Sequence, residues 1–122
     1  MQRIKTLFLN KEQSKEIISY NYDMEDAVFR IIPYEDGEII EEADCCQGLD
    51  YAIPTYSLQE MLAKFPTSIK EGEFTILPFE NKIGYAMWEG SEMYGWCDDF
   101  EFEFSVDGAY ELFVTLLQKR YM

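Results

Sequence analysis

The feature that most constrains the fold of this chain is an alternation of aromatic and acidic residues near the C-terminal end. Every second residue of the run is a phenylalanine and the residues between are acidic: Phe100, Phe102 and Phe104 alternate with Asp99, Glu101 and Glu103. Successive side chains of a β-strand point to opposite faces of the sheet. The pattern therefore predicts a strand over about residues 94–104, with one face in the core and the other in water.

The segment after this strand predicts a helix that covers the apolar face. Asp107 is placed to cap a helix over about residues 108–120. Lys119 and Arg120 fall in its last turn, where cations complement the helix dipole. Apolar residues recur at helical spacing and form a broad stripe: Ala109, Leu112, Phe113, Leu116 and Leu117. We expect this stripe to pack on the phenylalanine face.

Two further strands are predicted ahead of the alternating run, over residues 73–79 and 83–89, which are rich in β-forming side chains. The segments 80–82 and 90–92 fit as turns between the three strands. We therefore expect the C-terminal half of the chain to contain an antiparallel three-strand meander.

A separate hairpin is predicted in the N-terminal half. Residues 27–34 are rich in β-formers and lead into Asp36-Gly37, which supplies the positive φ that tight hairpin turns require. Residues 38–43 return as the partner strand. Because Pro33 has no amide donor, we expect this hairpin at the edge of a sheet rather than at its centre.

The first helix is predicted by its capping residues. Asn10 can cap the helix N-terminus, and Gln13 stands three residues later, where its side chain can reach back. A helix over about residues 11–20 follows, and we expect Ile17 and Ile18 on its inner face.

A second helix follows a linker of mixed character over residues 44–56. Ser57 and Glu60 form a capping box, in which each side chain accepts a hydrogen bond from the other residue's amide. Pro66 stops the helix. The apolar positions recur at helical spacing: Leu58, Met61, Leu62 and Phe65.

The order of predicted elements is helix, two strands, helix, three strands, helix. Because the strands arrive as hairpins, we expect an α+β fold with an antiparallel sheet, made of the N-terminal hairpin and the C-terminal meander and covered by three helices. A chain of 122 residues suits one core, so we expect residues 1–122 to form a single domain. The aromatic content of 16% argues against disorder despite the charge.

The chain contains no histidine, which is the usual acid/base group near neutral pH and the commonest metal ligand. Its absence disfavours catalytic triads and His-bearing zinc sites. Cys45, Cys46 and Cys97 lack Cys-x-x-Cys spacing and are odd in number, which suits a reducing compartment. The first residues lead into no signal-peptide core. We expect a cytoplasmic protein that is not an enzyme, without cofactor or metal.

The net charge of −14 is segregated along the chain. Residues 20–63 and 71–111 each hold eleven acidic residues and one basic residue. Carboxylates repel nucleic-acid phosphates and anionic lipid headgroups, so we expect no direct contact with nucleic acid or a membrane. A basic protein is the partner that this charge favours. The same acid density can mimic the phosphate array of DNA, or it can serve solubility alone.

Part of the chain resembles known proteins in its pattern. Residues 53–62 read Ile-Pro-Thr-Tyr-Ser-Leu-Gln-Glu-Met-Leu, and a β meander and the segment 107–112, Asp-Gly-Ala-Tyr-Glu-Leu, follow. This pattern resembles small uncharacterised proteins of gut Bacteroidetes genomes and their phages or mobile elements, and it covers about residues 52–122. The resemblance implies an accessory protein of a mobile element and carries over no activity or site residue.

The acidic row near the C-terminal end permits more than one interpretation. Its members lie close together in the sequence: Asp98, Asp99, Glu101 and Glu103. A calcium site needs six to eight converging oxygens, and a sugar hydrolase needs two facing carboxyls in a cleft. A row on one strand face projects in parallel instead, which is typical of a solvated sheet face.

An aromatic set lies around the predicted turn at 90–92. Tryptophan and tyrosine are enriched at protein interfaces, although they also fill cores. The set and its acidic rim are Tyr85, Trp88, Tyr94 and Trp96 with Glu89, Glu92 and Asp98. We expect an interaction module that uses the acidic row and these aromatic residues to bind a basic partner. The alternatives are a carboxylate-dependent hydrolase and a homodimer closed by the aromatic surface.

Overall fold

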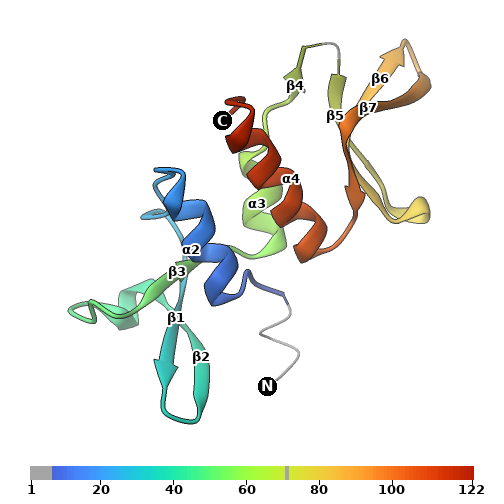
Figure 1. Ribbon diagram of the computed structural model, residues 1–122. Coiled ribbons are helices and arrows are strands. Elements are labelled where there is room, and N and C mark those ends of the chain that lie inside the picture. Colours follow the sequence, from blue (N-terminus) through green and yellow to red (C-terminus); the bar gives the residue numbers. More distant parts are fainter. Residues whose placement is uncertain (1–6, 71) are drawn as a thin grey trace. The chain divides into compact units, whose positions relative to one another are not determined.

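The computed structural model describes residues 7–70 and 72–122 (Figure 1). The chain divides into two compact units, Met1–Glu60 and Met61–Met122, and each unit contains one antiparallel sheet. The predicted α+β class with antiparallel sheets is confirmed, and the described residues form three α-helices. The predicted single sheet is wrong: the hairpin and the meander belong to two separate sheets, of three and four strands, and one short strand joins each of them. That residues 1–122 form a single domain stays a prediction.

The first unit begins with helix α2 (Lys11–Ser19), and its predicted capping box is confirmed. Asn10 Oδ1 accepts a hydrogen bond from the Gln13 amide at 2.7 Å, and Gln13 Oε1 accepts one from the Asn10 amide at 2.9 Å. Ile17 is fully buried, but Ile18 is 40% exposed. The expectation for Ile18 was wrong because consecutive helical residues point about 100° apart.

The sheet of the first unit has the order β2-β1-β3, with β1 (Phe29–Tyr34), β2 (Gly37–Glu42) and β3 (Ile53–Thr55). The predicted hairpin is confirmed, but Tyr34 pairs with Gly37, so the turn is Glu35-Asp36, one residue earlier than expected. Gly37 has a φ of 147°.

The predicted edge position of this hairpin holds for β2 and is wrong for β1, which is the central strand. The added neighbour β3 lies in the segment 44–56, and the 3₁₀ helix η1 (Ala43–Cys46) begins one residue before that segment. It pairs only with Phe29–Ile31. Pro33 lies beyond the paired part of β1, where its missing amide removes no hydrogen bond to β3.

Helix α3 (Leu58–Lys64) begins at the predicted capping box and ends before Pro66. The Ser57 amide donates to Glu60 Oε1 at 2.9 Å, and the Glu60 amide donates to Ser57 Oγ at 3.1 Å. Met61 is fully buried and Phe65 is nearly so. The structure therefore confirms the second predicted helix, including the capping box at its start and its end before Pro66.

The second unit contains a sheet of order β4-β5-β6-β7. Its strands are β4 (Ser68–Ile69), β5 (Gly72–Leu77), β6 (Lys82–Glu89) and β7 (Glu92–Glu103). The meander of β5, β6 and β7 is confirmed, and β4 adds a short strand that was not expected. The 3₁₀ helix η2 (Pro78–Glu80) and Asn81, with a φ of 55°, connect β5 to β6.

Helix α4 (Val106–Gln118) begins earlier than predicted. Ser105, not Asp107, is its N-cap, and Ser105 Oγ accepts a hydrogen bond from the Gly108 amide at 3.0 Å. Both residue types cap well, and the extended backbone at Ser105, right after β7, selects the earlier one. Lys119 is the C-cap, so neither it nor Arg120 lies in the last helical turn, as had been expected.

The apolar face of α4 packs on β7 and β6, as the sequence predicts. Ala109, Leu112, Phe113 and Leu116 are fully buried, whereas Leu117 is half-buried. A Cβ at Gly108 would lie 1.7 Å from the Glu103 carbonyl oxygen, so only glycine permits this approach of helix to strand. Aromatic rings then run through the core with centroids 5.3–5.9 Å apart: Phe113, Phe65, Phe74, Tyr85, Phe100 and Tyr121.

Candidate binding surface on strand β7

Strand β7 is interrupted by a large bulge, which the sequence did not predict. Gly84 pairs with Glu101 and Ala86 pairs with Trp96, so one residue of β6 faces the four residues 97–100 of β7. Asp99 adopts a left-handed conformation with a φ of 71°. Bulges of this kind re-aim side chains and are frequent near functional sites. The doublet Asp98-Asp99, which breaks the alternation, was the signal that could have found it.

The bulge lies in close contact with a glycine. A Cβ at Gly84 would lie 1.6 Å from the carbonyl oxygen of Phe100. Any larger residue there would force the two strands apart. The close approach of β6 and β7 beside Asp99 therefore depends on glycine at position 84.

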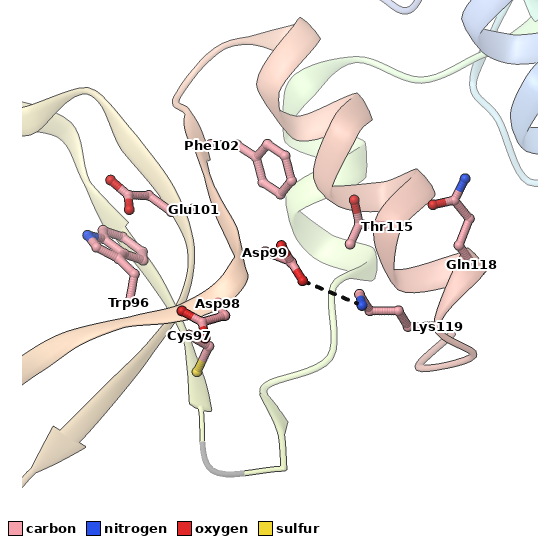
Figure 2. Close-up of a pocket in the computed structure, with 9 residues that line it drawn as sticks. All are labelled: Trp96, Cys97, Asp98, Asp99, Glu101, Phe102, Thr115, Gln118 and Lys119. Carbon is pink, nitrogen blue, oxygen red and sulfur yellow. Dashed lines mark ion pairs between the residues drawn. The ribbon is translucent and has the colours of Figure 1, made fainter.

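Two adjoining pockets lie at the bulge, with volumes of about 530 Å³ and about 740 Å³. In Figure 2, Asp99 and Lys119 point toward one another, while Trp96 and Glu101 lie on the side of β7 away from α4. The residues that line both pockets are Trp96, Cys97, Asp98, Asp99 and Lys119. The first pocket is completed by Glu101, Phe102, Thr115 and Gln118. The bulge and the end of α4 thus form one depression, which is mainly polar in the first pocket and more apolar in the second, where Ile69, Met87 and Tyr121 contribute.

An ammonium group of the chain itself sits at this depression. Lys119 Nζ lies 3.8 Å from Asp99 Oδ2 and 5.9 Å from the centroid of the Phe100 ring. The side chains of Lys119 and Asp99 are 43% and 74% exposed. The contact is an open ion pair with a cation–π component, which water and salt weaken.

The acidic row is exposed, but the bulge divides it between the two sides of β7: Asp99 points toward Lys119 of α4, whereas Glu101 lies on the side away from α4 (Figure 2). The expectation that Asp99 and Glu101 share one face is therefore wrong, because the bulge breaks the strand alternation between them. Its four members Asp98, Asp99, Glu101 and Glu103 are all exposed. Phe100 is buried, and Phe102 and Phe104 are half-buried. Within the row, Glu101 Oε2 forms an ion pair with Lys82 Nζ at 2.8 Å. Glu103 accepts hydrogen bonds from Asn81 and Ser105, each at 3.3 Å.

The aromatic set does not form one exposed patch. Tyr85 is fully buried and its hydroxyl donates to the Pro66 carbonyl at 2.7 Å, so it belongs to the core and not to a surface. Trp88 is half-buried and donates from Nε1 to Thr75 Oγ1 at 2.9 Å. Residues three apart on a strand face opposite sides, which separates these two side chains. Tyr94 is 63% exposed, and half-buried Trp96 lines the pockets.

The hairpin tip between β6 and β7 carries two carboxylates in register. Glu89 pairs with Glu92 across the turn, and both residues are exposed. Like charges directly opposite one another destabilise a strand pair. The tip is therefore a local source of repulsion in the free protein.

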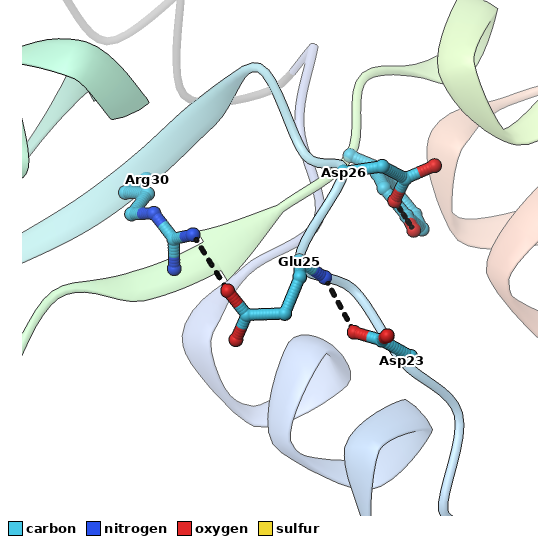
Figure 3. A network of polar contacts seen from close by, with 5 residues as sticks. Asp23, Glu25, Asp26 and Arg30 are labelled. Carbon is cyan, nitrogen blue, oxygen red and sulfur yellow. Dashed lines mark hydrogen bonds and ion pairs between the residues drawn. The ribbon is translucent and has the colours of Figure 1, made fainter.

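Carboxylates of the first unit are arranged differently, as Figure 3 shows for Asp23, Glu25 and Asp26. Glu25 pairs with Arg30 at 3.5 Å, and Asp23 Oδ1 accepts a hydrogen bond from the Glu25 amide at 2.8 Å. Asp26 Oδ1 accepts one from the hydroxyl of fully buried Tyr56 at 2.6 Å. Burial, followed by this hydrogen bond, raises the pKa of Tyr56. These acids serve local structure.

Metal-ligating side chains are scattered. Across residues 7–70 and 72–122, no group of three or more Cys, Asp and Glu side chains is arranged to hold a metal ion. Cys45 is exposed, Cys46 is buried, and Cys97 is half-buried at the pockets. None of the helices in the described part of the chain is long and apolar enough to cross a membrane.

The carboxylate-dependent hydrolase, which was the alternative function, would need carboxylates in a pocket, and three of them lie at the depression. Asp98, Asp99 and Glu101 line the first pocket, but all three are exposed, and two of them already pair with lysines. This alternative stays a prediction, and so does the resemblance of residues 52–122 to proteins of gut Bacteroidetes. The chain matches no protein-family model, no curated protein and no solved structure.

Proposed function

We propose that this protein is a non-catalytic interaction module that binds a basic surface of a partner protein through strand β7. The observation that carries the proposal is the acidic row, whose members Asp98, Asp99, Glu101 and Glu103 are all exposed on one strand. Strand β7 is the last strand of its sheet, so the row lies at an edge. A row of like charges at an edge is accessible to a partner of opposite charge.

Few cations of the chain neutralise this region. The ion pairs there join Lys82 to Glu101 and Lys119 to Asp99. Asp98, Glu89 and Glu92 form no ion pair with any residue that the structure describes. A basic partner relieves the repulsion among these carboxylates, which favours association.

Side chains rather than backbone supply the binding groups in this proposal. A free strand edge attracts other strands, and charges and bulges are the usual means of preventing that pairing. Strand β7 has both, with the bulge at residues 97–100 and carboxylates along its length. The edge therefore suits an electrostatic contact better than strand addition.

A salt titration with matched charge variants tests the proposal. The row variant carries Asp98→Asn, Asp99→Asn, Glu101→Gln and Glu103→Gln, and asparagine suits the left-handed φ of residue 99. The control variant carries Glu35→Gln, Asp36→Asn, Glu41→Gln and Glu42→Gln in the first unit, so that both variants lose the same charge. A basic protein captured from host lysate is purified, and its affinity is measured by calorimetry.

The row variant should lose at least about tenfold in affinity and most of its salt dependence between about 0.05 M and about 0.5 M sodium chloride. The control variant should stay within about twofold of wild type. Equal losses in both variants would mean that overall charge, and not strand β7, governs binding. Displacement of the partner by duplex DNA would identify the row as a nucleic-acid mimic.

A further inference from the structure

We propose that the depression at the β7 bulge receives an arginine or lysine side chain of the basic partner, in the place that Lys119 holds in the free protein. This inference rests on the proposed function and assigns the contact within it. Lys119 is thus an internal stand-in for the partner's cation. The inference is carried by the two pockets, by the groups around Lys119 and by the carboxylates that the bulge exposes.

The lining of the depression suits a cation. Asp98, Asp99 and Glu101 supply carboxylates, and Trp96 supplies an aromatic side chain. A volume of about 530 Å³ falls within the range of pockets that hold small ligands. Guanidinium groups bind carboxylates with two parallel hydrogen bonds, so the exposed carboxylates of Asp98 and Asp99 suit such a group. Three carboxylates against the single ammonium group of Lys119 in the lining of the first pocket favour a cation over an anion.

Lys119 already demonstrates the contacts that such a cation makes. Its ammonium group lies 3.8 Å from the Asp99 carboxylate and 5.9 Å from the centroid of the Phe100 ring. The Phe100 ring in turn packs against Tyr121, with centroids 5.9 Å apart. The carboxylate and the supported ring together form a site for a positive charge.

The Lys119 side chain can move away from Asp99 without disturbing the fold. Lys119 is the C-cap of α4, and its backbone amide is bonded to the Thr115 carbonyl at 3.0 Å. Its side chain is 43% exposed, and the ion pair is at the long end of the range. Exposed pairs of this kind contribute little net stability, so an incoming cation displaces the side chain at small cost.

The bulge holds the carboxylate that receives the cation. On a regular strand, Asp98 and Asp99 would point to opposite faces. The bulge exposes both, and the Phe100 carbonyl next to them approaches Gly84 so closely that no larger residue fits there. A preorganised group loses less entropy on binding than a mobile one.

The test uses a hexa-arginine peptide as the probe and the indole NMR signals of the two tryptophans as the readout. Trp96 lines the depression, and Trp88 is bonded to Thr75 instead. The Trp96→Phe variant assigns the two signals. Binding should shift the Trp96 signal and leave the Trp88 signal nearly unchanged.

Two lysine variants with the same charge change provide the matched comparison. Lys119→Gln removes the stand-in, and Lys15→Gln removes an exposed lysine of α2 in the first unit. Lys119→Gln should tighten probe binding by about twofold to fivefold, in line with the release of an exposed ion pair. Lys15→Gln should change it by less than that, and Asp99→Asn should weaken it.

The outcomes separate this inference from the proposed function. If both lysine variants tighten binding equally and the Trp96 signal does not move, the depression is not the cation site. The proposed function would then still stand if the row variant loses the probe. If the row variant binds the probe as well as wild type does, both the inference and the proposed function are wrong.

Discussion

The two units of this protein contain similar amounts of acid but use it differently. In the first unit, Glu60 accepts hydrogen bonds from the Ser57 and Val28 amides, and Asp26 accepts one from the Tyr56 hydroxyl. In the second unit, the acidic row lies exposed along one strand, with Lys82 and Lys119 as its ion-pair partners. The acids that give the chain its net charge of −14 therefore do not all have the same role.

The difference teaches that a carboxylate count predicts neither stability nor binding. A carboxylate that satisfies a backbone amide at a helix start stabilises the fold, because the amide has no other partner there. A carboxylate on an open strand face contributes little to stability and stays available to a partner. Removing the hydrogen-bonded carboxylates of Asp26 or Glu60 should accordingly destabilise the first unit, whereas removing the acidic row should weaken binding in the second.

The largest expected effect is that of Glu60→Ala. This change removes the acceptor for two amides, one at the start of α3 and one at Val28. It should lower the free energy of unfolding by about 2–3 kcal/mol. Urea unfolding followed by circular dichroism measures it. If Glu60→Ala loses no more unfolding free energy than a substitution of an exposed acid does, the proposed difference between the acids of the two units is wrong.

Tyr56→Phe should have the next largest effect. The hydroxyl hydrogen bond to Asp26 is lost, and we expect about 1–2 kcal/mol of destabilisation near neutral pH. Thermal unfolding measures the loss. Tyr85→Phe is the matched change in the second unit, where the lost hydrogen bond goes to the Pro66 carbonyl and not to a carboxylate. A smaller loss in Tyr85→Phe would support the structural role of the first unit's acids.

The same tyrosines predict an alkaline limit to stability. Burial raises the pKa of Tyr56 and of Tyr85 above the ordinary value, so the folded state favours the neutral phenol. Their stability contribution is complete below the unfolded pKa of about 10 and is lost as the pH rises above it, because the unfolded state ionises first. Each tyrosine adds a slope of about 1.4 kcal/mol per pH unit. Each phenylalanine variant should flatten the alkaline limb, and unchanged slopes would contradict the assignment.

Arg120→Gly tests whether stability and binding are independent in the second unit. Arg120 has a φ of 64°, and the Tyr121 and Arg120 amides bond to the carbonyls of Leu116 and Leu117, which is the pattern of a helix end that favours glycine. The change should stabilise the protein by about 0.5–1 kcal/mol. Thermal unfolding checks the gain, and affinity for the basic partner should stay within about twofold.

The smallest expected effect is that of Glu101→Gln, which removes the exposed pair with Lys82. The free energy of unfolding should change by less than about 0.5 kcal/mol. Urea unfolding of Glu101→Gln and Glu60→Ala under the same conditions compares an exposed acid of the second unit with a hydrogen-bonded acid of the first. A loss as large as that of Glu60→Ala would show that the row also stabilises the fold.

Local signals predicted most of the fold. The capping boxes at Asn10 and Ser57 set the starts of α2 and α3, and both are present in the structure. The alternation over 99–104 predicted a half-buried strand, and Phe100 is buried while its acidic neighbours are exposed. These signals succeed because caps and strand periodicity depend on residues only a few positions apart.

The candidate site was predicted only in part. The acidic row was identified, but Tyr85 was placed at a surface and is in the core. The bulge at residues 97–100, the pairing of β3 with β1 and the approach of Lys119 to Asp99 were all missed. Each of these depends on segments that are distant in the sequence, and no local pattern reports them.

The sequence by itself determined the helices, the hairpins, the segregation of acid and the solvent-facing row, because these follow from capping chemistry, periodicity and charge counts. Tertiary structure alone decided which carboxylates serve the fold and which remain at the surface. It also turned Asp98-Asp99 from two positions on a strand into one side of a pocket beside Lys119. The physical reason is packing, since the close contact at Gly84 and the docking of α4 on β7 fix where the bulge forms.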